Sequence, residues 1–384
     1  MMRVLWKLPT AKGWTGGLNY FANLARALRT LSERSIQPVV FDTAPDRPAP
    51  LDECPAIPRP PAPSPWSWSG LRGRLQPGFI YERHLRAHRI DVASHLAQPP
   101  RGSHVPFAGW IPDFQHRHLP DFFSHEERRR RDERHARMAA EAQLVMLSSV
   151  AVRADYARFH PAYVEKARVL RFAVFPPVEP EPVERTLILA RLGITRPYFH
   201  VPNQLWAHKN HALVAEALLR LRARGACPLV VSTGAAADGA GTEHAGRLRA
   251  RVSEIGLEDH FRFLGLLDHR STFALMRESI AVINPSRFEG WSTSVEEARS
   301  MGKSILLSDL PVHSEQDPPR AAYFSPDDAD GLASCMAAAL DAWNPDEEQR
   351  AAASARERVL PRVQAFAQAY ASILDEALVG CRAG

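Results

Sequence analysis

The feature that most constrains the fold is a regular alternation of strand-like and helix-like patterns in the second half of the chain. Short apolar runs alternate there with longer segments whose apolar residues recur at helical spacing. The expected strands are 198–201, 228–232, 261–263 and 280–284, and the expected helices between them are 210–224, 243–255 and 271–278. This alternation is typical of a parallel sheet covered by helices on both faces. We therefore predict an α/β fold.

The next unit of the pattern carries two carboxylates, Glu289 and Glu297, eight residues apart. They lie on a loop and a short helix (about 293–301) between the strand 280–284 and a second strand, 304–307. Ligands of open α/β sheets bind at the carboxyl ends of the strands, where this loop is expected. A helix start suits a phosphate, and an ionised carboxylate accepts hydrogen bonds from hydroxyl groups. The pattern predicts a sugar-nucleotide site.

The segments EGWSTSVEEA (289–298) and MGKSILLSDLPVHSEQ (301–316) resemble the donor-binding region of family 4 glycosyltransferases. Members of that family are retaining enzymes of the GT-B architecture, which has two Rossmann-like parallel-sheet domains. The resemblance is strongest from about 201 to 330. It implies that Glu297 binds the ribose hydroxyls of the donor and that Glu289 contacts the transferred sugar. The other residues of this turn that we expect in the donor site are Gly290, Trp291, Ser292 and Thr293, whereas Glu296 is expected to face solvent or to support the site indirectly.

A second motif follows the strand 198–201, where Lys209 stands just before a helix. A lysine at this edge of the sheet is well placed to meet a diphosphate as a point charge. The family often has an arginine six residues earlier, but this chain has Asn203 there, whose amide can still donate a hydrogen bond to the donor. The alternative interpretation is a polar helix start without a ligand.

Two further groups of candidate residues lie in the first half. Gly16 and Gly17 end the first strand-to-helix turn, where the resemblance implies a glycine-rich loop near the donor phosphate. Asp113 and His116 follow a strand at 104–110 and are candidate catalytic residues. Many family members carry His-Asp at this strand end, whereas this chain has Pro112-Asp113 with the histidine three residues later, and the resemblance implies a hydrogen bond from one of them to the transferred sugar. The alternatives are a turn cap for Asp113 and a surface imidazole for His116. The histidines of this segment, His116, His118 and His125, stand at spacings that give no fixed ligand geometry, so we expect no metal site.

The length of 384 residues favours two domains. We expect an N-terminal Rossmann-like acceptor domain over 1–178, with strands at 3–8, 38–42, 104–110 and 144–148 and a helix at 17–31. A Pro-rich segment at about 45–65 is predicted to be an extended loop. A donor domain is expected over 179–358. The last helix (346–378) is predicted to break at Pro361, and the resemblance implies that 359–384 cross back to the N-terminal domain.

Composition excludes several classes. The net charge of +5 comes with an arginine-rich run at 126–137 in which acids alternate with bases, so a solvated helix face is favoured over an anionic-membrane surface. No aromatic and basic platform for nucleic acid is present. No apolar run reaches 18 residues, and the N-terminus is unlike a secretory signal. Widely spaced cysteines favour reduced thiols in a cytoplasmic protein, and peripheral contact with the inner membrane face stays open.

The resemblance thus implies a retaining hexosyltransferase of bacterial polysaccharide or lipopolysaccharide type. It would use a GDP- or UDP-linked sugar, a glycan or lipid-linked glycan acceptor, no other cofactor and no metal. Two alternatives stay open: a binding protein of GT-B fold without activity, and a UDP-sugar epimerase of similar fold.

Overall fold

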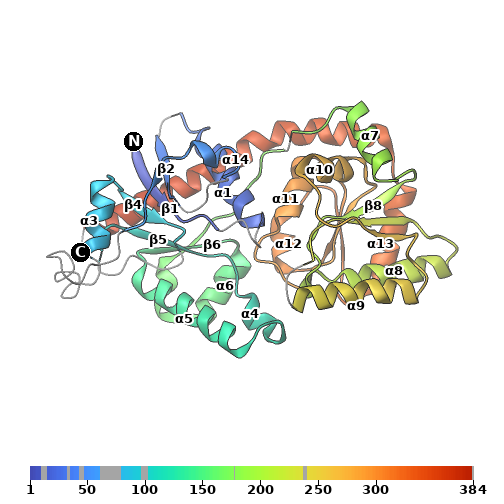
Figure 1. Ribbon diagram of the computed structural model, residues 1–384, viewed down its shortest axis with the longest axis horizontal. Coiled ribbons are helices and arrows are strands. Elements are labelled where there is room, and N and C mark those ends of the chain that lie inside the picture. The colour runs from blue at the N-terminus through green and yellow to red at the C-terminus, as the bar shows by residue number, and fades with distance from the viewer. Residues whose placement is uncertain are drawn as a thin grey trace. The chain divides into compact units, whose positions relative to one another are not determined.

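The computed structural model describes residues 1–9, 15–32, 35–42, 47–60, 79–96, 103–176, 178–236 and 240–382. The chain divides into two compact units, Met1–Ala173 with Pro361–Gly384 (unit 1) and Val174–Leu360 (unit 2). The sequence expectation placed the boundaries at 178/179 and 358/359. Each unit is built around a parallel sheet with helices on both faces (Figure 1), so the predicted α/β fold class with two parallel-sheet domains is confirmed.

Unit 1 holds a seven-stranded sheet of order β3-β2-β1-β4-β5-β6-β7. Its strands are β1 (Met2–Trp6), β2 (Ile36–Phe41), β3 (Ala56–Ile57), β4 (Val92–Ser94), β5 (Phe107–Ile111), β6 (Leu144–Leu147) and β7 (Ala167–Val169). Its helices are α1 (Thr15–Leu28), α3 (Phe79–Ala87), α4 (Gln115–His118), α5 (His125–Glu141) and α6 (Val150–Phe159), with 3-10 turns η1 (Leu51–Glu53), η2 (Pro120–Phe122) and η3 (Pro161–Lys166).

Unit 2 holds a six-stranded sheet of order β10-β9-β8-β11-β12-β13. Its strands are β8 (Tyr198–Val201), β9 (Leu229–Ser232), β10 (Phe261–Phe263), β11 (Val282–Asn284), β12 (Ile305–Ser308) and β13 (Ala321–Phe324). Its helices are α7 (Pro182–Arg191), α8 (His211–Ala223), α9 (Ala240–Glu254), α10 (His269–Glu278), α11 (Thr293–Ser300), α12 (Pro311–Gln316) and α13 (Ala329–Asp341), with the turn η4 (Ala207–Lys209). Helices α8, α9 and α13 cover one face of the sheet, and α7 and α10 cover the other (Figure 1).

The strands of unit 2 form because their apolar runs are buried on both faces. All residues of β8, β9 and β12 are buried, as expected for parallel strands between two helical layers. The tight connection from α11 to β12 depends on Gly302. Its φ is +71°, and a Cβ there would lie 2.4 Å from the carbonyl oxygen of Ala351, so only glycine fits this turn.

The helix α14 (Pro345–Arg382) is shared by the two units, because its residues from Pro361 onward belong to unit 1. The predicted break at Pro361 is wrong, since one helix runs through this residue. A proline inside a helix removes one backbone hydrogen bond, and packing on both sides of Pro361 offsets that loss: Val359 and Val363 are both buried.

The Pro-rich segment is only in part the extended loop that was predicted. Its described residues include the turn η1 and the two-residue strand β3, which pairs with β2 at the edge of the sheet. Pro55 and Pro58 flank β3 and limit it to this length, because proline cannot donate a ladder hydrogen bond. The remainder, residues 61–65 and 45–46, lies outside the described residues.

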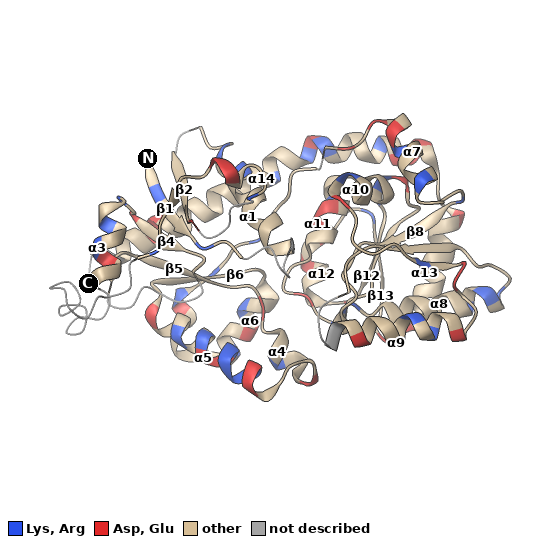
Figure 2. Ribbon diagram, in the orientation of Figure 1, with Lys and Arg blue, Asp and Glu red and all other residues tan. Residues whose placement is uncertain are grey.

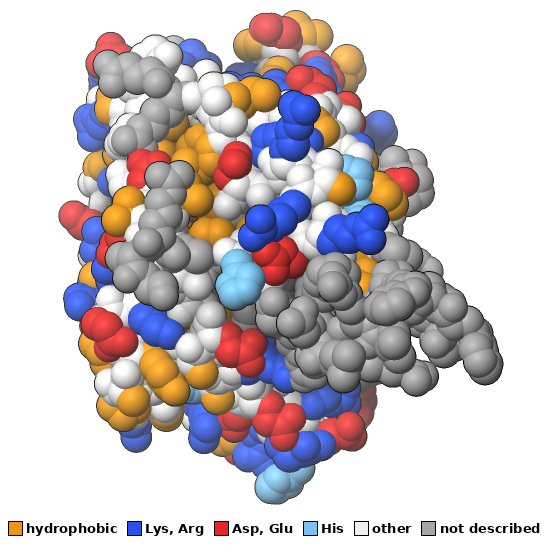
Figure 3. All heavy atoms as spheres, turned by 90° about the vertical axis from the view of Figure 1, so that its left-hand side faces the viewer, with side chains coloured by type: hydrophobic (Ala, Val, Ile, Leu, Met, Phe, Trp, Pro, Cys, Tyr) orange, Lys and Arg blue, Asp and Glu red, His pale blue; other side chains and the backbone are white. Residues whose placement is uncertain are grey.

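The arginine-rich run forms α5, along which basic and acidic side chains alternate (Figure 2). Ion pairs at four-residue spacing join Arg129 to Glu133, Arg130 to Glu126 and Arg131 to Glu127. Acidic and basic side chains are also interspersed on the face that Figure 3 shows. These features agree with the solvated helix face favoured from the sequence. Among the helices of the described residues, none is long and apolar enough to cross a membrane.

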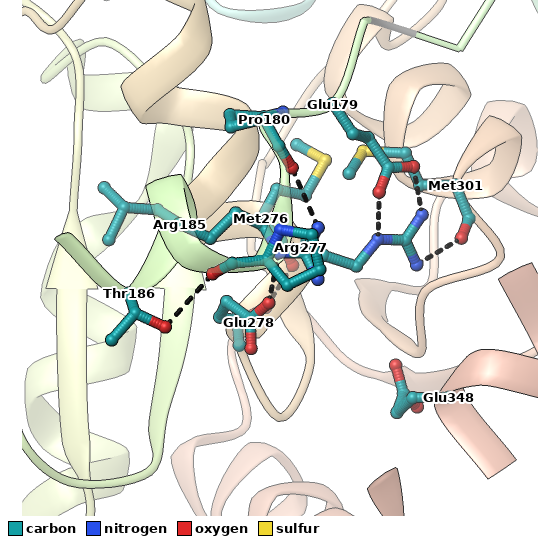
Figure 4. Close-up of polar contacts among 12 residues, drawn as sticks. Glu179, Pro180, Arg185, Thr186, Met276, Arg277, Glu278, Met301 and Glu348 are labelled. Carbon is teal, nitrogen blue, oxygen red and sulfur yellow. Dashed lines mark hydrogen bonds and ion pairs between the residues drawn. The ribbon is translucent and has the colours of Figure 1, made fainter. Parts of the chain in front are cut away.

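A network of ion pairs surrounds a cavity of about 510 Å³ in unit 2, lined by 179–182, the end of α10 and the start of α14. Arg277 donates two hydrogen bonds to Glu179 and a third, of 2.9 Å, to the carbonyl oxygen of Met301 (Figure 4). Lys303 is fully buried, donates to the carbonyl oxygen of Ser279 at 2.6 Å, and pairs with Glu348. These contacts hold the segment 179–182 and the start of α14, the two ends of unit 2, against the end of α10 and the loop before β12.

Candidate functional site

The candidate site lies in unit 2, at the carboxyl ends of β8 and β11. These strands are neighbours at the point where the strand order reverses, which is where sheets of this kind bind ligands. The loops that follow them are joined by a backbone hydrogen bond of 2.8 Å from the Arg287 N–H to the His208 carbonyl oxygen. The loop with Lys209 and the loop with Glu289 are therefore held against each other.

Asn210 fixes the first loop between η4 and α8. It has a left-handed backbone, with φ of +56°, and its side-chain amide donates to the carbonyl oxygens of Pro285 at 3.1 Å and Pro326 at 2.8 Å. Asparagine tolerates this conformation better than most residues. The result is that Lys209, the residue before it, is held at the sheet edge beside the end of β11.

Lys209 and Glu289 form an ion pair of 2.6 Å between Nζ and Oε1, with side chains only 15% and 9% exposed. The hydroxyl oxygen of Ser286 lies 2.7 Å from the same Oε1. Burial by itself would raise the pKa of Glu289. The charge of Lys209 and its hydrogen bond outweigh that effect and lower the pKa, so Glu289 is ionised at neutral pH.

Glu297 lies on α11, which begins after Ser292 and presents the unpaired N–H groups of its first turn. The Ser292 hydroxyl does not cap this helix; it accepts a hydrogen bond of 2.7 Å from Asn284. The carboxyl group of Glu297 is half-buried and has no hydrogen-bond or ion-pair partner in the described part of the chain. Burial raises its pKa to about 8. The group is thus available to a ligand that brings hydrogen-bond donors.

The neighbouring Glu296 corrects one expectation, because it does not face solvent. Its side chain is fully buried, and its Oε1 accepts a hydrogen bond of 3.2 Å from Gln316 of α12. The same Gln316 also bonds the backbone of Ser292 in both directions, at 3.3 and 3.1 Å. Glu296 and Gln316 therefore fix the start of α11 and the turn that carries Glu289.

Asn203 is buried beside this turn, and its side-chain NH2 group, which carries two donor hydrogens, has no partner in the described residues. Its Oδ1 lies 3.4 Å from the Ser294 hydroxyl. The loop after β9 packs closely on it: at Gly234, with φ of +129°, a Cβ would lie 2.6 Å from the Asn203 carbonyl oxygen. An unsatisfied buried amide is costly, so its presence here favours a ligand acceptor. Gly290, Trp291 and Thr293 are half-buried in the same region.

The candidate residues of the first half belong to unit 1. Gly16 and Gly17 lie in the first turn of α1, and not in the turn before the helix where the sequence placed them; residues 10–14 of that turn lie outside the described residues. Asp113 accepts a hydrogen bond of 2.9 Å from the Gln115 N–H at the start of α4. His116 is 1% exposed, and its Nε2 lies 2.8 Å from Asp132 of α5. The side chains of Asp113 and His116 thus have contacts within unit 1, and the roles of all four residues in the reaction stay predictions.

Sequence reasoning missed Ser286, His313 and Gln316, which hold the predicted residues in place, and it considered Asn210 only as a cap of the polar helix start. A left-handed Asn between two helical segments and the spacing Ser286–Glu289 are weak local signals. His313 and Gln316 approach the site only through the packing of α12. Around the site and elsewhere in the described residues, no group of three or more His, Cys, Asp or Glu is arranged to hold a metal ion.

Comparison with solved structures shows the same architecture. The chain matches a glycosyltransferase from Rickettsia africae ESF-5 with a TM-score of 0.72 and 13% identity, over 98% of each chain. It matches Anabaena Alr3699/HepE in complex with UDP-glucose with a TM-score of 0.70 and 17% identity, over 98% of this chain and 100% of the other. WaaG, a glycosyltransferase involved in lipopolysaccharide biosynthesis, gives 0.62 and 14%, over 99% of each chain. At these identities the likeness establishes the fold, which is GT-B as predicted.

Sequence comparison adds a family for part of the chain. Residues 197–342 match the family described as Glycosyl transferases group 1. No curated protein matches the chain. The matched range contains Asn203, Lys209, Glu289 and Glu297, so the expected enzyme class, a glycosyltransferase, is confirmed for the part that carries the candidate site. The chain has the GT-B fold, and its residues 197–342 match the glycosyl transferases group 1 family.

Proposed function

We propose that the protein is a retaining hexosyltransferase that moves a sugar from a nucleoside diphosphate to a hydroxyl group of a glycan or lipid-linked glycan. The observation that carries the proposal is the arrangement at the edge of the unit 2 sheet. It combines an ammonium group (Lys209) paired with an ionised carboxylate (Glu289) in the loop before α11, and a carboxyl group without a partner in the described residues (Glu297) on α11 itself. A nucleotide sugar offers a diphosphate, a sugar and a ribose to these three groups.

In the proposed complex, the ribose hydroxyls donate hydrogen bonds to Glu297, and the transferred sugar donates to Glu289. Lys209, the Asn203 amide and the N–H groups at the start of α11 face the diphosphate. Preorganised donors of this kind stabilise the charge that develops on a leaving group. The Anabaena protein has been solved in complex with UDP and with UDP-glucose, which supports a uridine nucleotide as the first donor to test.

The proposed reaction breaks the bond between the anomeric carbon and the diphosphate oxygen, and the electron pair leaves with the diphosphate. The acceptor hydroxyl oxygen forms the new bond on the same face of the sugar, and its proton passes to a phosphate oxygen of the leaving group. Lys209 first pairs with Glu289 and then shares its charge with the diphosphate. Unit 1 is proposed to bind the acceptor, with Asp113 and His116 contributing to that side of the reaction.

The proposal is tested by a thermal-shift screen with UDP, GDP and their hexose derivatives, since a ligand of the folded state raises its apparent stability. The nucleotide sugar with the largest shift is then incubated with lipid-linked and free glycan acceptors. We expect release of the nucleoside diphosphate together with a product whose anomeric configuration, measured by NMR, equals that of the donor. An inverted product would refute retention. Epimerisation of the donor without any acceptor would refute transfer.

A further inference from the structure

His313, on the short helix α12, has a fixed tautomer. Its ring is completely buried, and its Nδ1 lies 2.8 Å from the carbonyl oxygen of Ser308. A carbonyl oxygen can only accept, so Nδ1 carries the hydrogen. Burial lowers the pKa of His313, and the ring is therefore neutral at physiological pH. The other nitrogen, Nε2, must then be a hydrogen-bond acceptor.

This acceptor has no partner in the described part of the chain. Among the residues that the structure describes, no group donates to Nε2 of His313. Buried acceptors in native proteins are nearly always bonded, and leaving one unmade destabilises the fold. An unsatisfied Nε2 inside a ligand-binding region therefore indicates a donor that arrives with the ligand.

The position of the ring ties it to the Lys209–Glu289 pair. The charges of both residues act on the pKa of His313, Glu289 raising it and Lys209 lowering it, so the ring lies within electrostatic range of the pair. A chain of contacts also links them. The Ser308 hydroxyl donates to the Ser286 carbonyl oxygen at 2.6 Å, and the Ser286 hydroxyl lies 2.7 Å from Glu289 Oε1. Both Lys209 and Ser286 contact Oε1, which leaves Oε2 of Glu289 without a partner in the described residues.

The site therefore presents two open acceptors in one region, Nε2 of His313 and Oε2 of Glu289. A diphosphate cannot satisfy them, because its oxygens are ionised at neutral pH and only accept. A hydroxyl group satisfies them well, since it has a hydrogen to donate. The polyol part of the donor, and not its diphosphate, matches this pair of acceptors.

We propose that Nε2 of His313 accepts a hydrogen bond from a hydroxyl group of the transferred sugar, next to the hydroxyl held by Glu289. This inference rests on the proposed function and adds a sugar-binding residue to it. It predicts that His313 distinguishes a nucleotide sugar from the bare nucleoside diphosphate, because only the former carries the hydroxyl.

Two variants separate this role from a structural one. In His313→Asn, the shorter amide still reaches the Ser308 carbonyl oxygen in place of Nδ1–H, but no atom replaces Nε2. In His313→Gln, the amide oxygen reaches the place of Nε2, but the Nδ1 donor is lost. The probes are UDP-glucose with UDP and GDP-mannose with GDP, and the pair that stabilises the wild type more is used for titration calorimetry.

We expect His313→Asn to weaken binding of the nucleotide sugar by about three- to tenfold, the effect of one neutral hydrogen bond, and to leave the affinity for the nucleoside diphosphate unchanged. His313→Gln should keep most of the difference between the two ligands. The inference is overturned if His313→Asn binds both ligands like the wild type, or loses both equally.

A measurement on the wild type covers the case in which a variant does not fold. With ¹⁵N-labelled histidine, the Nε2 resonance of His313 should shift on addition of the nucleotide sugar and stay in place with the nucleoside diphosphate. An unchanged Nε2 resonance in the presence of a bound nucleotide sugar contradicts the inference. If the wild type neither binds nor transfers any nucleotide sugar, it is the proposed function that fails.

Discussion

Glu297→Gln gives the sharpest test of the donor site, because it changes one atom of a side chain that has no partner in the described residues. Burial raises the pKa of the Glu297 carboxyl from 4.5 to about 8. In the free protein the group is therefore mostly protonated at pH 7. If ribose hydroxyls donate to the ionised form, binding must remove that proton, so the affinity for the donor depends on pH.

The expected pH dependence follows from the fraction of Glu297 that is ionised. For a pKa of about 8, the affinity of the wild type should rise roughly eightfold between pH 6.5 and 7.5 and begin to level off above pH 8. The diphosphate of a nucleotide sugar does not titrate in this range, and burial lowers the pKa of His208 to about 3 and also lowers that of His313. The variant should bind with an affinity that does not change with pH. At pH 8.5 it should be weaker by about 1.5–3 kcal/mol, the usual contribution of a hydrogen bond to a charged group.

The free energy of unfolding of the wild type should change with pH in the opposite sense to its affinity for the donor. A carboxyl group whose pKa is higher in the folded state binds its proton more tightly there, so the free energy of unfolding falls as pH rises from 4.5 to about 8. The full shift corresponds to at most about 5 kcal/mol at 1.36 kcal/mol for each pH unit. Water near this half-buried side chain reduces it to about 1–3 kcal/mol. The glutamine variant, which cannot ionise, should equal the wild type near pH 4.5 and exceed it by that amount at pH 8.5.

Calorimetric titrations at pH 6.5, 7.5 and 8.5 and urea unfolding at the same pH values provide both measurements. Glu296→Gln is the matched control, since this carboxylate is adjacent in sequence but bonds to Gln316 inside the protein. It should keep the pH dependence of the wild type. An affinity of the wild type that is flat from pH 6.5 to 8.5, together with an unchanged affinity of Glu297→Gln, would refute the ribose assignment.

Three further predictions concern other parts of unit 2. Lys209→Met should lower turnover by at least about 100-fold and destabilise unit 2 by about 1–3 kcal/mol, because it leaves the Glu289 carboxylate unpaired. Adding Glu289→Gln to this variant should restore the stability measured by urea unfolding but not the turnover. If turnover also returned, Lys209 would not act by its positive charge on the diphosphate. Arg277→Met should cost about 2–4 kcal/mol through loss of its paired contacts with Glu179, whereas Arg356→Met, which removes an exposed charge 3.9 Å from the same carboxylate, should stay within about 0.5 kcal/mol. Turnover should be unaffected by EDTA, because Lys209 supplies the positive charge; loss of activity that Mg²⁺ restores would show that a metal is needed.

The sequence was informative where short apolar runs are buried on both faces. The strand at 198–201 and the strand at 261–263 were predicted with the observed bounds, and β9, β11 and β12 differ by one or two residues. Strands β3, β4 and β7 have only two or three residues and were missed, because the first half lacks the regular alternation of strands and helices that marked the equally short β10. In β7 the central residue is Arg168, a charged residue that is unusual in a strand and whose guanidinium forms an ion pair with Glu376 of α14.

For the site, the sequence indicated which side chains carry the chemistry but not what holds them. Strand ends in a parallel sheet share one edge, and this geometric rule is enough to predict that Lys209 and Glu289 lie in the same region. The burial of Glu296 was not predictable from its spacing to Glu289, because it depends on Gln316 at the end of α12. The same holds for His313, whose orientation comes from the Ser308 carbonyl oxygen.

The shared helix α14 has a consequence for biosynthesis. Unit 1 needs residues after Pro361 to complete its interior: the Trp6 indole donates to the Tyr370 hydroxyl at 2.7 Å, and the ring of Phe366 lies 6.1 Å from that of Tyr20. While the ribosome is still making residues 174–360, these aromatic groups have no final partners. The half of the protein that is translated first is therefore the last to reach its native state, and a fragment ending near residue 173 should not fold without the C-terminal helix.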